Sequence, residues 1–369
     1  MVTSRERVLA ALNHCKTDRV PRLLYGELIG YTPAIEKLLK EKCTPKTARE
    51  YFDMDMTGIA PNATKLDINR LSEWLPVEAQ QAVEKVSTFS KTYGVSGAIP
   101  VDEWGVWWRQ GSFYHFAHIE SPLKMINDMS RIKEFPWPDL DSQYRYEGLS
   151  EKVHSIQQAG VAVAAFAGSI FEQAWYIRGM EQLLEDMLLN PEIANFIFER
   201  TAYYQKEVGV NMAKTGVDMI MLGDDVAMQN GLIMKAETWR EFLKPRLQKT
   251  IRAIKEVRPE VKIFYHSDGN VEQLIPELIE VGVDVLNPVQ PECMNPSEIK
   301  QKYGDKLAFL GTVSVQQTMP YGSVNDVKME VEQRIKTVGR NGGLVLAPAH
   351  VLGPEVQWEN IVAFFEACG

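Results

Sequence analysis

Strand-like and helix-like segments alternate along most of this chain, and this alternation limits the folds that it can adopt. Short apolar, β-prone runs lie at residues 22–27, 54–60, 161–168, 217–225, 261–266, 283–287, 307–311 and 344–348. Helical segments separate them, among them residues 4–12, 32–42, 146–158, 180–189, 191–214, 236–256, 271–281 and 324–339. Such a repeated βα alternation predicts a (β/α)8 barrel rather than a doubly wound sheet. No G-x-G-x-x-G motif follows a strand, which also argues against a dinucleotide-binding fold.

One region interrupts the alternation after the second strand. Residues 85–95 and 101–116 alternate between polar and apolar side chains, with glycines at turn spacing, which is typical of antiparallel hairpins. The P-W-P sequence at residues 136–138 marks the end of this region. We therefore expect one barrel domain over residues 1–369 with an inserted hairpin subregion at about residues 74–138.

Composition excludes several classes of function. The net charge is −9 without a cluster of Lys and Arg, so a nucleic-acid partner is not expected. No apolar run is long enough to cross a membrane, and the charged N-terminal helix does not resemble a secretory signal. The four cysteines are scattered and form no C-x-x-C pair. These features predict a cytoplasmic protein.

The candidate site begins at the sequence V-K-I-F-Y-H-S-D-G of residues 261–269, where a buried strand ends in His266 and Asp268. Polar residues at the carboxyl ends of barrel strands are where such folds carry out chemistry. The other strand ends supply Glu27, Glu172, Asp224, Asp225, Asn287 and His350. Histidines and carboxylates gathered there can bind a divalent ion. The alternative is that they cap helices and tie loops together, and for Asp224 and Asp225 both interpretations stay open.

Aromatic residues and one cysteine have two interpretations each. The cluster of Trp104, Trp107 and Trp108 forms either the apolar face of the insertion or a wall for a flat ligand. Cys293 lies in a loop with two prolines and no neighbouring base, which predicts an unreactive thiol.

Several motifs together resemble the uroporphyrinogen decarboxylase superfamily. They are R-E-R-V-L-A-A-L-N-H at residues 5–14, D-R-V-P at 18–21, V-D-E-W-G at 101–105, F-A-G-S-I-F-E-Q-A-W-Y-I-R-G at 166–179, G-D-D-V-A-M-Q-N-G at 223–231, and two stretches at 278–291 and 342–350. The resemblance covers essentially the whole chain and implies a (β/α)8 barrel. Decarboxylases of this superfamily carry an arginine-rich R-Q-A-G-R type motif after the first strand. Here that position reads P-R-L-L-Y-G-E-L, which does not suit a substrate with many carboxylates.

The other branch comprises cobalamin-dependent methyltransferases, which exchange a methyl group with a corrinoid on a partner protein. Its thiol-methylating members bind zinc through an H-x-C motif and a further cysteine after the last strand. This chain keeps His266 but has Asp268 and Ala349 at the cysteine positions. Nitrogen and oxygen ligands leave a metal more electrophilic and favour an oxygen substrate. The resemblance therefore points to an anaerobic O-demethylase of aryl methyl ethers.

On this basis we expect zinc at His266, Asp268 and His350. Glu27, Glu172 and Asp225 are the expected catalytic residues, and Trp104, Trp175, Tyr176 and Asn287 are expected to bind the substrate. The expected partners are a corrinoid protein, a methoxylated aromatic compound and a second copy of the chain in a homodimer. The alternatives are a methyltransferase for a methylamine or a thiol, and a non-catalytic barrel that binds a small ligand.

Overall fold

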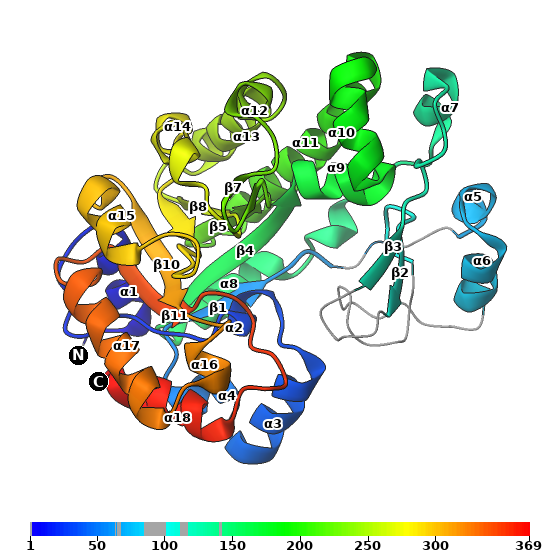
Figure 1. Cartoon of the computed structure of the whole chain (residues 1–369). Coiled ribbons are helices and arrows are strands. Elements are labelled where there is room, and N and C mark those ends of the chain that lie inside the picture. Colours follow the sequence, from blue (N-terminus) through cyan, green and yellow to red (C-terminus); the bar gives the residue numbers. More distant parts are fainter. Residues whose placement is uncertain (1, 63, 65–67, 85–100, 111–116, 140–141) are drawn as a thin grey trace.

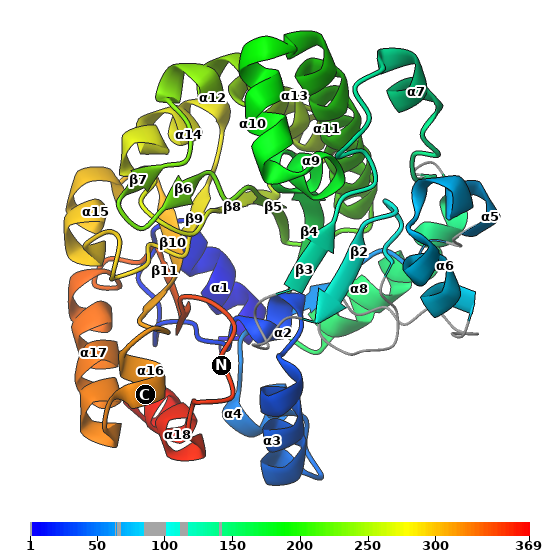
Figure 2. The same ribbon diagram turned by 45° about the vertical axis from the view of Figure 1, so that its right-hand side comes forward.

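A computed structural model describes all residues except 1, 63, 65–67, 85–100, 111–116 and 140–141 (Figure 1). Its main sheet is parallel and has the order β1-β4-β5-β8-β9-β10-β11, with helices on the outside (Figure 1, Figure 2). The strands are β1 (Met56–Ile59), β4 (Ala162–Ser169), β5 (Met219–Gly223), β8 (Lys262–His266), β9 (Val285–Asn287), β10 (Ala308–Val313) and β11 (Leu344–Pro348). All seven were predicted from the apolar runs.

A short extended segment, residues 21–23, takes the place of the eighth strand of the barrel. Arg22 forms a parallel bridge with Leu346 of β11, and the Leu23 amide donates to the Leu346 carbonyl over 3.0 Å. On its other side, the Arg22 carbonyl accepts from the Asp55 amide, directly before β1. The segment thus joins the two edges of the sheet, and the predicted (β/α)8 fold is confirmed.

The helices of the structure include one in each predicted helical segment and others outside those segments. They are α1 (Ser4–Leu12), α2 (Gly26–Ile29), α3 (Pro33–Cys43), α4 (Ala48–Phe52), α5 (Ile68–Leu71), α6 (Val77–Glu84), α7 (Met129–Glu134), α8 (Leu149–Gln158), α9 (Phe171–Arg178), α10 (Met180–Leu189), α11 (Pro191–Lys214), α12 (Ala236–Phe242), α13 (Lys244–Val257), α14 (Ile275–Val281), α15 (Pro296–Tyr303), α16 (Thr318–Tyr321), α17 (Val324–Thr337) and α18 (Trp358–Ala367). None of the helices in the described residues is long and apolar enough to span a membrane.

Two predicted elements differ from the structure. The expected first strand does not reach Glu27, because the chain turns at Tyr25 and enters the short helix α2. The helix expected at residues 236–256 is divided into α12 and α13 at Leu243, since Pro245 has no amide to continue the first helix.

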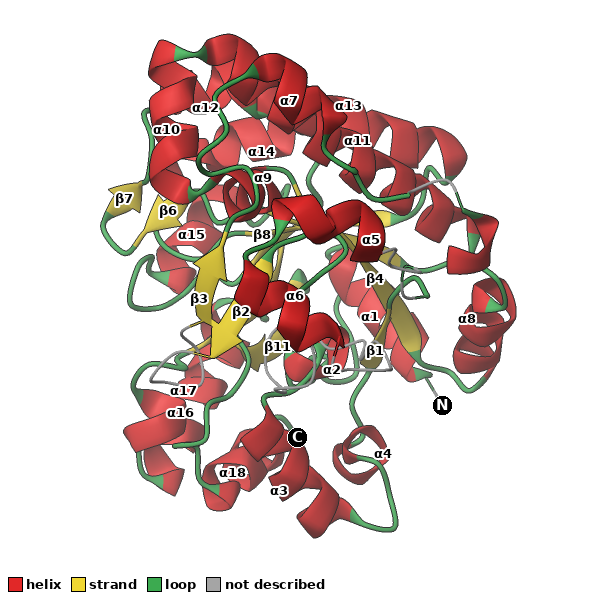
Figure 3. Cartoon of the chain, turned by 90° about the vertical axis from the view of Figure 1, so that its right-hand side faces the viewer, coloured by secondary structure: helices red, strands yellow, loops and turns green. Residues whose placement is uncertain are grey.

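The inserted range contains one described hairpin and several helices. Strands β2 (Trp107–Gln110) and β3 (Ala117–Glu120) pair antiparallel, as the alternation predicted. Residues 77–84, by contrast, form the helix α6, and the hairpin sequence at residues 85–95 lies outside the described residues. This region lies beside the end of β4 and helix α9 (Figure 1, Figure 3).

Buried Arg178 connects the segment after the hairpin, residues 123–127, with the barrel. Arg178, the last residue of α9, forms an ion pair with Asp186 at 2.6 Å, and both side chains are fully buried. The same guanidinium donates to the carbonyls of Leu123 and Ile126 and to the side chain of Asn127. Each of the three guanidinium nitrogens therefore meets an acceptor, which is the condition under which a buried charge is tolerated.

We expect Arg178→Ala to lower the free energy of unfolding by about 3–5 kcal/mol, because Asp186 would be left as an unpaired buried charge. Chemical denaturation measures the effect. Arg252→Ala is the matched control, since Arg252 forms an exposed ion pair with Glu256 and its loss should change stability little. Equal stability of the two variants would contradict the structural role of Arg178.

Candidate metal centre

The end of β8 fixes the orientation of His266. Its Nδ1 atom lies 2.5 Å from the Asn287 Oδ1 atom, and the Asn287 Nδ2 atom donates to the Leu310 carbonyl over 2.8 Å. That second hydrogen bond orients the amide so that its oxygen faces the histidine, which must then carry its proton on Nδ1. The Nε2 lone pair is therefore free to bind a metal.

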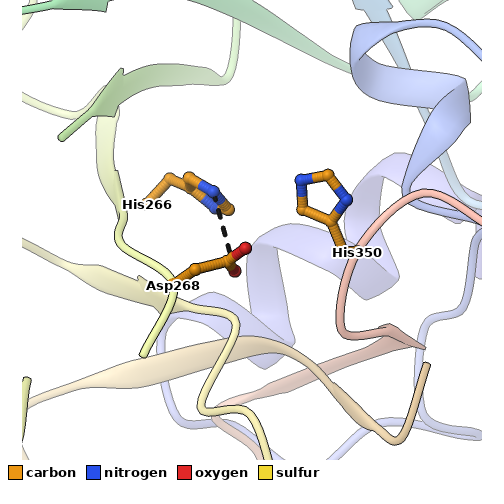
Figure 4. Close-up of side chains that lie close together, drawn as sticks. All are labelled: His266, Asp268 and His350. Carbon is orange, nitrogen blue, oxygen red and sulfur yellow. Dashed lines mark ion pairs between the residues drawn. The ribbon is translucent and has the colours of Figure 1, made fainter. Parts of the chain in front are cut away.

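Two further side chains approach the Nε2 side of His266. One ligand atom from each of His266, Asp268 and His350 lies within 4.8 Å of the others (Figure 4). The distance from His266 Nε2 to the Asp268 Oδ1 atom is 3.8 Å. His266 ends β8, Asp268 follows it, and His350 comes two residues after the end of β11, so the group lies at the carboxyl ends of the strands.

The donor atoms suit a divalent cation. Asp268 Oδ1 is buried and has no hydrogen-bond partner, although it faces His266. A buried carboxylate oxygen without a donor is costly unless a ligand satisfies it. Two imidazoles and a carboxylate with an open side are also the donor types found in catalytic zinc sites. The residues therefore fit a metal ion such as zinc.

The surroundings shift the pKa values of the two histidines in opposite directions. Burial lowers the pKa of His266, but the carboxylates of Asp225 and Asp268 outweigh it and the net pKa is raised. Burial and the neighbouring His266 lower the pKa of His350, which favours its neutral form. The negative charge that attracts a proton to His266 would equally attract a cation.

Asp224 and Asp225 are neighbours with separate tasks. The Asp224 Oδ1 atom accepts hydrogen bonds from the backbone amides of Phe171 and Glu172, at 2.5 and 3.2 Å, and so caps helix α9. Asp225 points into the site, where its Oδ1 atom lies 3.6 Å from His266 Nε2 and accepts from the Asp268 amide at 2.7 Å. Asp224 therefore caps a helix, whereas Asp225 lies beside His266, where its expected catalytic role stays a prediction.

Glu172 lies in the first turn of α9 beside these groups. Burial raises its pKa to about 7, with a further contribution from the Asp225 carboxylate. Ser169 and Tyr176 donate to its two oxygens at 2.9 and 3.0 Å. Gly223 leaves the necessary room, since a Cβ atom there would lie 2.8 Å from the Ser169 hydroxyl. A carboxyl group with such a pKa can hold and release a proton near neutral pH.

The aromatic residues divide between the site and the core. Tyr176 packs edge-on against Trp175 and against Trp108 of β2, with centroid distances of 4.2 and 4.9 Å. These rings connect the hairpin with Glu172. Trp104, in contrast, is 1% exposed and packs against Trp137 and Tyr204. Its expected role in substrate binding stays a prediction, although little of the side chain is exposed.

Two other predicted residues are also placed differently. Glu27 lies on α2, and its oxygens accept hydrogen bonds from Tyr31 and Thr57 at 2.9 and 2.8 Å. The structure does not bring it into the cluster, and its catalytic role stays a prediction. Asn287 is fully buried and its amide contacts His266 and Leu310, so it orients His266. Its expected role in substrate binding stays a prediction.

Sequence reasoning missed Tyr25. Its ring is 3% exposed and lies against both histidines, with centroid distances of 5.9 Å to His266 and 5.7 Å to His350. Burial raises its pKa well above the usual range, so the hydroxyl stays protonated. Its place at the end of the first extended segment was the available signal. Cys293 has its pKa raised to about 11, mainly by burial, in agreement with the expected unreactive thiol.

We expect Asn287→Leu to weaken metal binding by about 10–100-fold, because the variant no longer fixes the tautomer of His266. Competition with a chelator of known affinity measures the change. Asn13→Leu is the control, since the Asn13 side chain donates only to the Leu9 carbonyl in α1. Unchanged affinity in Asn287→Leu would show that the hydrogen bond does not orient the ligand.

The fold and the site together define a (β/α)8 barrel with a metal-capable centre at the mouth. The chain belongs to the uroporphyrinogen decarboxylase family, whose model matches residues 105–369. It is 22% identical over 378 residues to uroporphyrinogen decarboxylase of Alcanivorax borkumensis, which covers 98% of this chain and 96% of that protein. The expected family is thereby confirmed.

Methyltransferases are also among the similar proteins. The chain is 26% identical over 205 residues to methylcobamide:CoM methyltransferase MtaA of Methanosarcina barkeri, and the match covers 52% of this chain and 57% of that protein. The chain thus spans little more than half the length of this relative. A solved methyltransferase from Methanosarcina mazei superposes with a TM-score of 0.66 at 18% identity, covering 100% of this chain and 98% of that one. This likeness supports the fold.

Proposed function

We propose that this protein is a corrinoid-dependent methyltransferase that removes the methyl group of an aryl methyl ether. The methyl group would pass to the cobalt of a corrinoid carried by a partner protein. The similarity to a methylcobamide:CoM methyltransferase supports the reaction class. The observation that supports an ether is the donor set, which has Asp268 and His350 but no cysteine among its described members.

The ligands determine how electrophilic the metal would be, and this property favours one class of substrate over another. Zinc, when bound by His266, Asp268 and His350, would supply a Lewis acid for the ether oxygen. Thiolates donate more charge than imidazole and carboxylate, and so suit a thiol substrate better. Ala349, at the position of a family cysteine, is 1% exposed and offers no ligand atom.

The surrounding residues would bind the ring and supply a proton. An aryl methyl ether is inert because phenolate is a poor leaving group, so charge must be stabilised on the oxygen as the bond breaks. Glu172, with its pKa near 7, would hold the proton for that oxygen. Asp225 would fix the backbone of Asp268 through its hydrogen bond. Trp108, Trp175 and Tyr176 would line the space for a flat ring.

A thiol is the second candidate substrate. It is favoured by the similarity to a methyltransferase whose name includes CoM, and opposed by the missing thiolate ligands. A non-catalytic barrel would have no need for a metal with an open side. We place the protein in the cytoplasm of an anaerobic organism, and a homodimer remains a prediction.

The proposal is tested by combining purified, zinc-loaded protein with a reduced corrinoid protein and a panel of methoxyarenes, methylamines and methylated thiols. Methylation of cobalt is followed by its absorbance, and the demethylated phenol is quantified separately. Methyl transfer from methoxyarenes supports the proposal. Transfer from a thioether or an amine alone would contradict the choice of substrate, and a metal-free, inactive protein would favour the binding barrel.

Decarboxylation of uroporphyrinogen is expected to be absent. The only arginine at residues 21–28 is Arg22, and its guanidinium donates to the carbonyls of Phe365 and Gly369, at 3.2 and 2.7 Å. It is therefore not available to a substrate with many carboxylates. Chromatography of the porphyrin products measures the activity, and release of carbon dioxide at an enzymatic rate would contradict this expectation.

A further inference from the structure

We infer that the substrate of this site carries no negative charge, so that the protein accepts an uncharged methoxyarene and discriminates against a methoxybenzoate. This inference rests on the proposed function and narrows its substrate class. The charged side chains around the candidate metal centre are acidic, and the arginines of the neighbouring elements are paired with other groups.

Three acidic side chains converge on the site without a lysine or arginine partner among the described residues. Glu172 is paired with the hydroxyls of Ser169 and Tyr176, and Asp225 with the Asp268 amide. The ion pairs of Asp225 and Asp268 both involve His266. Among the described residues, no ion pair joins these carboxylates to a lysine or an arginine. A dication held by the two histidines and Asp268 would be largely offset by the charges of Asp268 and Asp225.

The arginines of the neighbouring elements are already engaged. Arg178, at the far end of α9 from Glu172, is fully buried against Asp186 and backbone carbonyls. Arg145 pairs with Glu103 and donates to Tyr204 at 2.9 Å. Arg109 follows Trp108 on β2 and pairs with Glu120 across the hairpin. Successive residues of a strand point to opposite faces, so Arg109 is directed away from the face on which Trp108 meets Tyr176.

The N-terminus of α9, which carries Glu172, offers no place for an anion either. The first amides of a helix commonly bind a carboxylate or a phosphate. In α9 the amides of Phe171 and Glu172 are taken by Asp224, which is 2% exposed. A carboxylate on the substrate ring would thus be desolvated among aromatic side chains and acidic groups without gaining a lysine or arginine partner among the described residues.

The decisive experiment compares two substrates that differ in charge but little in size, 4-hydroxy-3-methoxybenzoate and 4-hydroxy-3-methoxybenzyl alcohol. Binding to the zinc-loaded protein is measured by calorimetry, and methyl transfer to the corrinoid protein is measured separately. We expect the alcohol to bind at least about tenfold more tightly, since an uncompensated buried charge costs more than the 1.4 kcal/mol that corresponds to this factor.

A variant tests the cause of this preference. In Asp225→Asn, removal of one negative charge should narrow the affinity ratio between alcohol and benzoate. Glu151→Gln, an exposed change on α8, is the matched control and should leave the ratio unchanged. A purely structural effect of Asp225→Asn would weaken both compounds equally and keep the ratio, which would contradict the electrostatic cause.

The outcomes separate the inference from the proposed function. Equal or tighter binding of the benzoate would overturn the inference while leaving an ether demethylase intact. Failure of both compounds to bind, and of every methoxyarene to donate its methyl group, would overturn the proposed function and the inference with it.

Discussion

Replacing His266 with alanine should remove the metal and reduce methyl transfer to background while the barrel stays folded. His266 supplies the Nε2 atom toward which Asp225 and Asp268 point, at 3.6 and 3.8 Å, and its own orientation is fixed by Asn287. Without it, a carboxylate and His350 alone would hold a zinc ion weakly. Its side chain lies at the carboxyl end of β8 and is not part of the hydrophobic core, so its loss should leave the packed interior almost unchanged.

Metal content by atomic emission, activity by cobalt methylation and folding by circular dichroism are the three measurements needed. His154→Ala is a matched control, because this histidine is exposed on α8 and its side chain hydrogen-bonds only to Gln158 among the described residues. A His266→Ala protein that keeps both zinc and activity would refute the assignment. A variant that loses its fold would show that His266 is structural.

Substituting Asp268 with cysteine should keep the metal but slow the demethylation of methoxyarenes about tenfold or more. The change restores the H-x-C pattern and replaces an oxygen donor with a thiolate, which lowers the electrophilicity of the metal. The leaving phenolate would then receive less stabilisation as the C–O bond breaks. The Asp268 backbone amide, which donates to Asp225, is retained in the variant.

Zinc content must be measured first, so that a slower reaction is not caused by an empty site. Asp305→Cys adds a thiol at an exposed position before β10, at the opposite end of the strand from the mouth, and serves as the control. Unchanged or faster turnover of the ether in Asp268→Cys would contradict the Lewis-acid explanation without affecting the fold. Faster methylation of a thiol would strengthen the link between ligand type and substrate.

The strands and the positions of the candidate metal ligands could be predicted because both follow from local sequence. An apolar run that ends in polar residues identifies a buried parallel strand and its carboxyl end, as in β8 with His266 and Asp268. In a barrel all such ends meet at one mouth, so His350 after β11 joins them without any further information. The alternation of strands and helices was therefore sufficient to predict that these three side chains lie at the same end of the barrel.

Contacts between distant segments could not be predicted in the same way. Trp104 packs on Tyr204, a hundred positions further along the chain, and nothing in V-D-E-W-G indicates which side its ring faces. Asn287 was recognised as a strand-end polar residue, but its hydrogen bonds depend on the spacing of β8, β9 and β10. Tyr25 was overlooked because aromatic residues at strand ends are usually read as core.

Because His350 and His266 lie at the ends of different strands, metal binding at both would raise the free energy of unfolding of the barrel. His266 ends β8 and His350 follows β11 by two residues. These strands are separated in the sheet by β9 and β10, and residues 21–23 pair with β11 at its edge. A cation bound by both histidines would cross-link two strands that are not hydrogen-bonded to each other in the sheet. By linkage, free metal at about 100 times its dissociation constant would stabilise the native state by about 2.7 kcal/mol. Thermal tolerance of this protein would then vary with the metal supply of its surroundings.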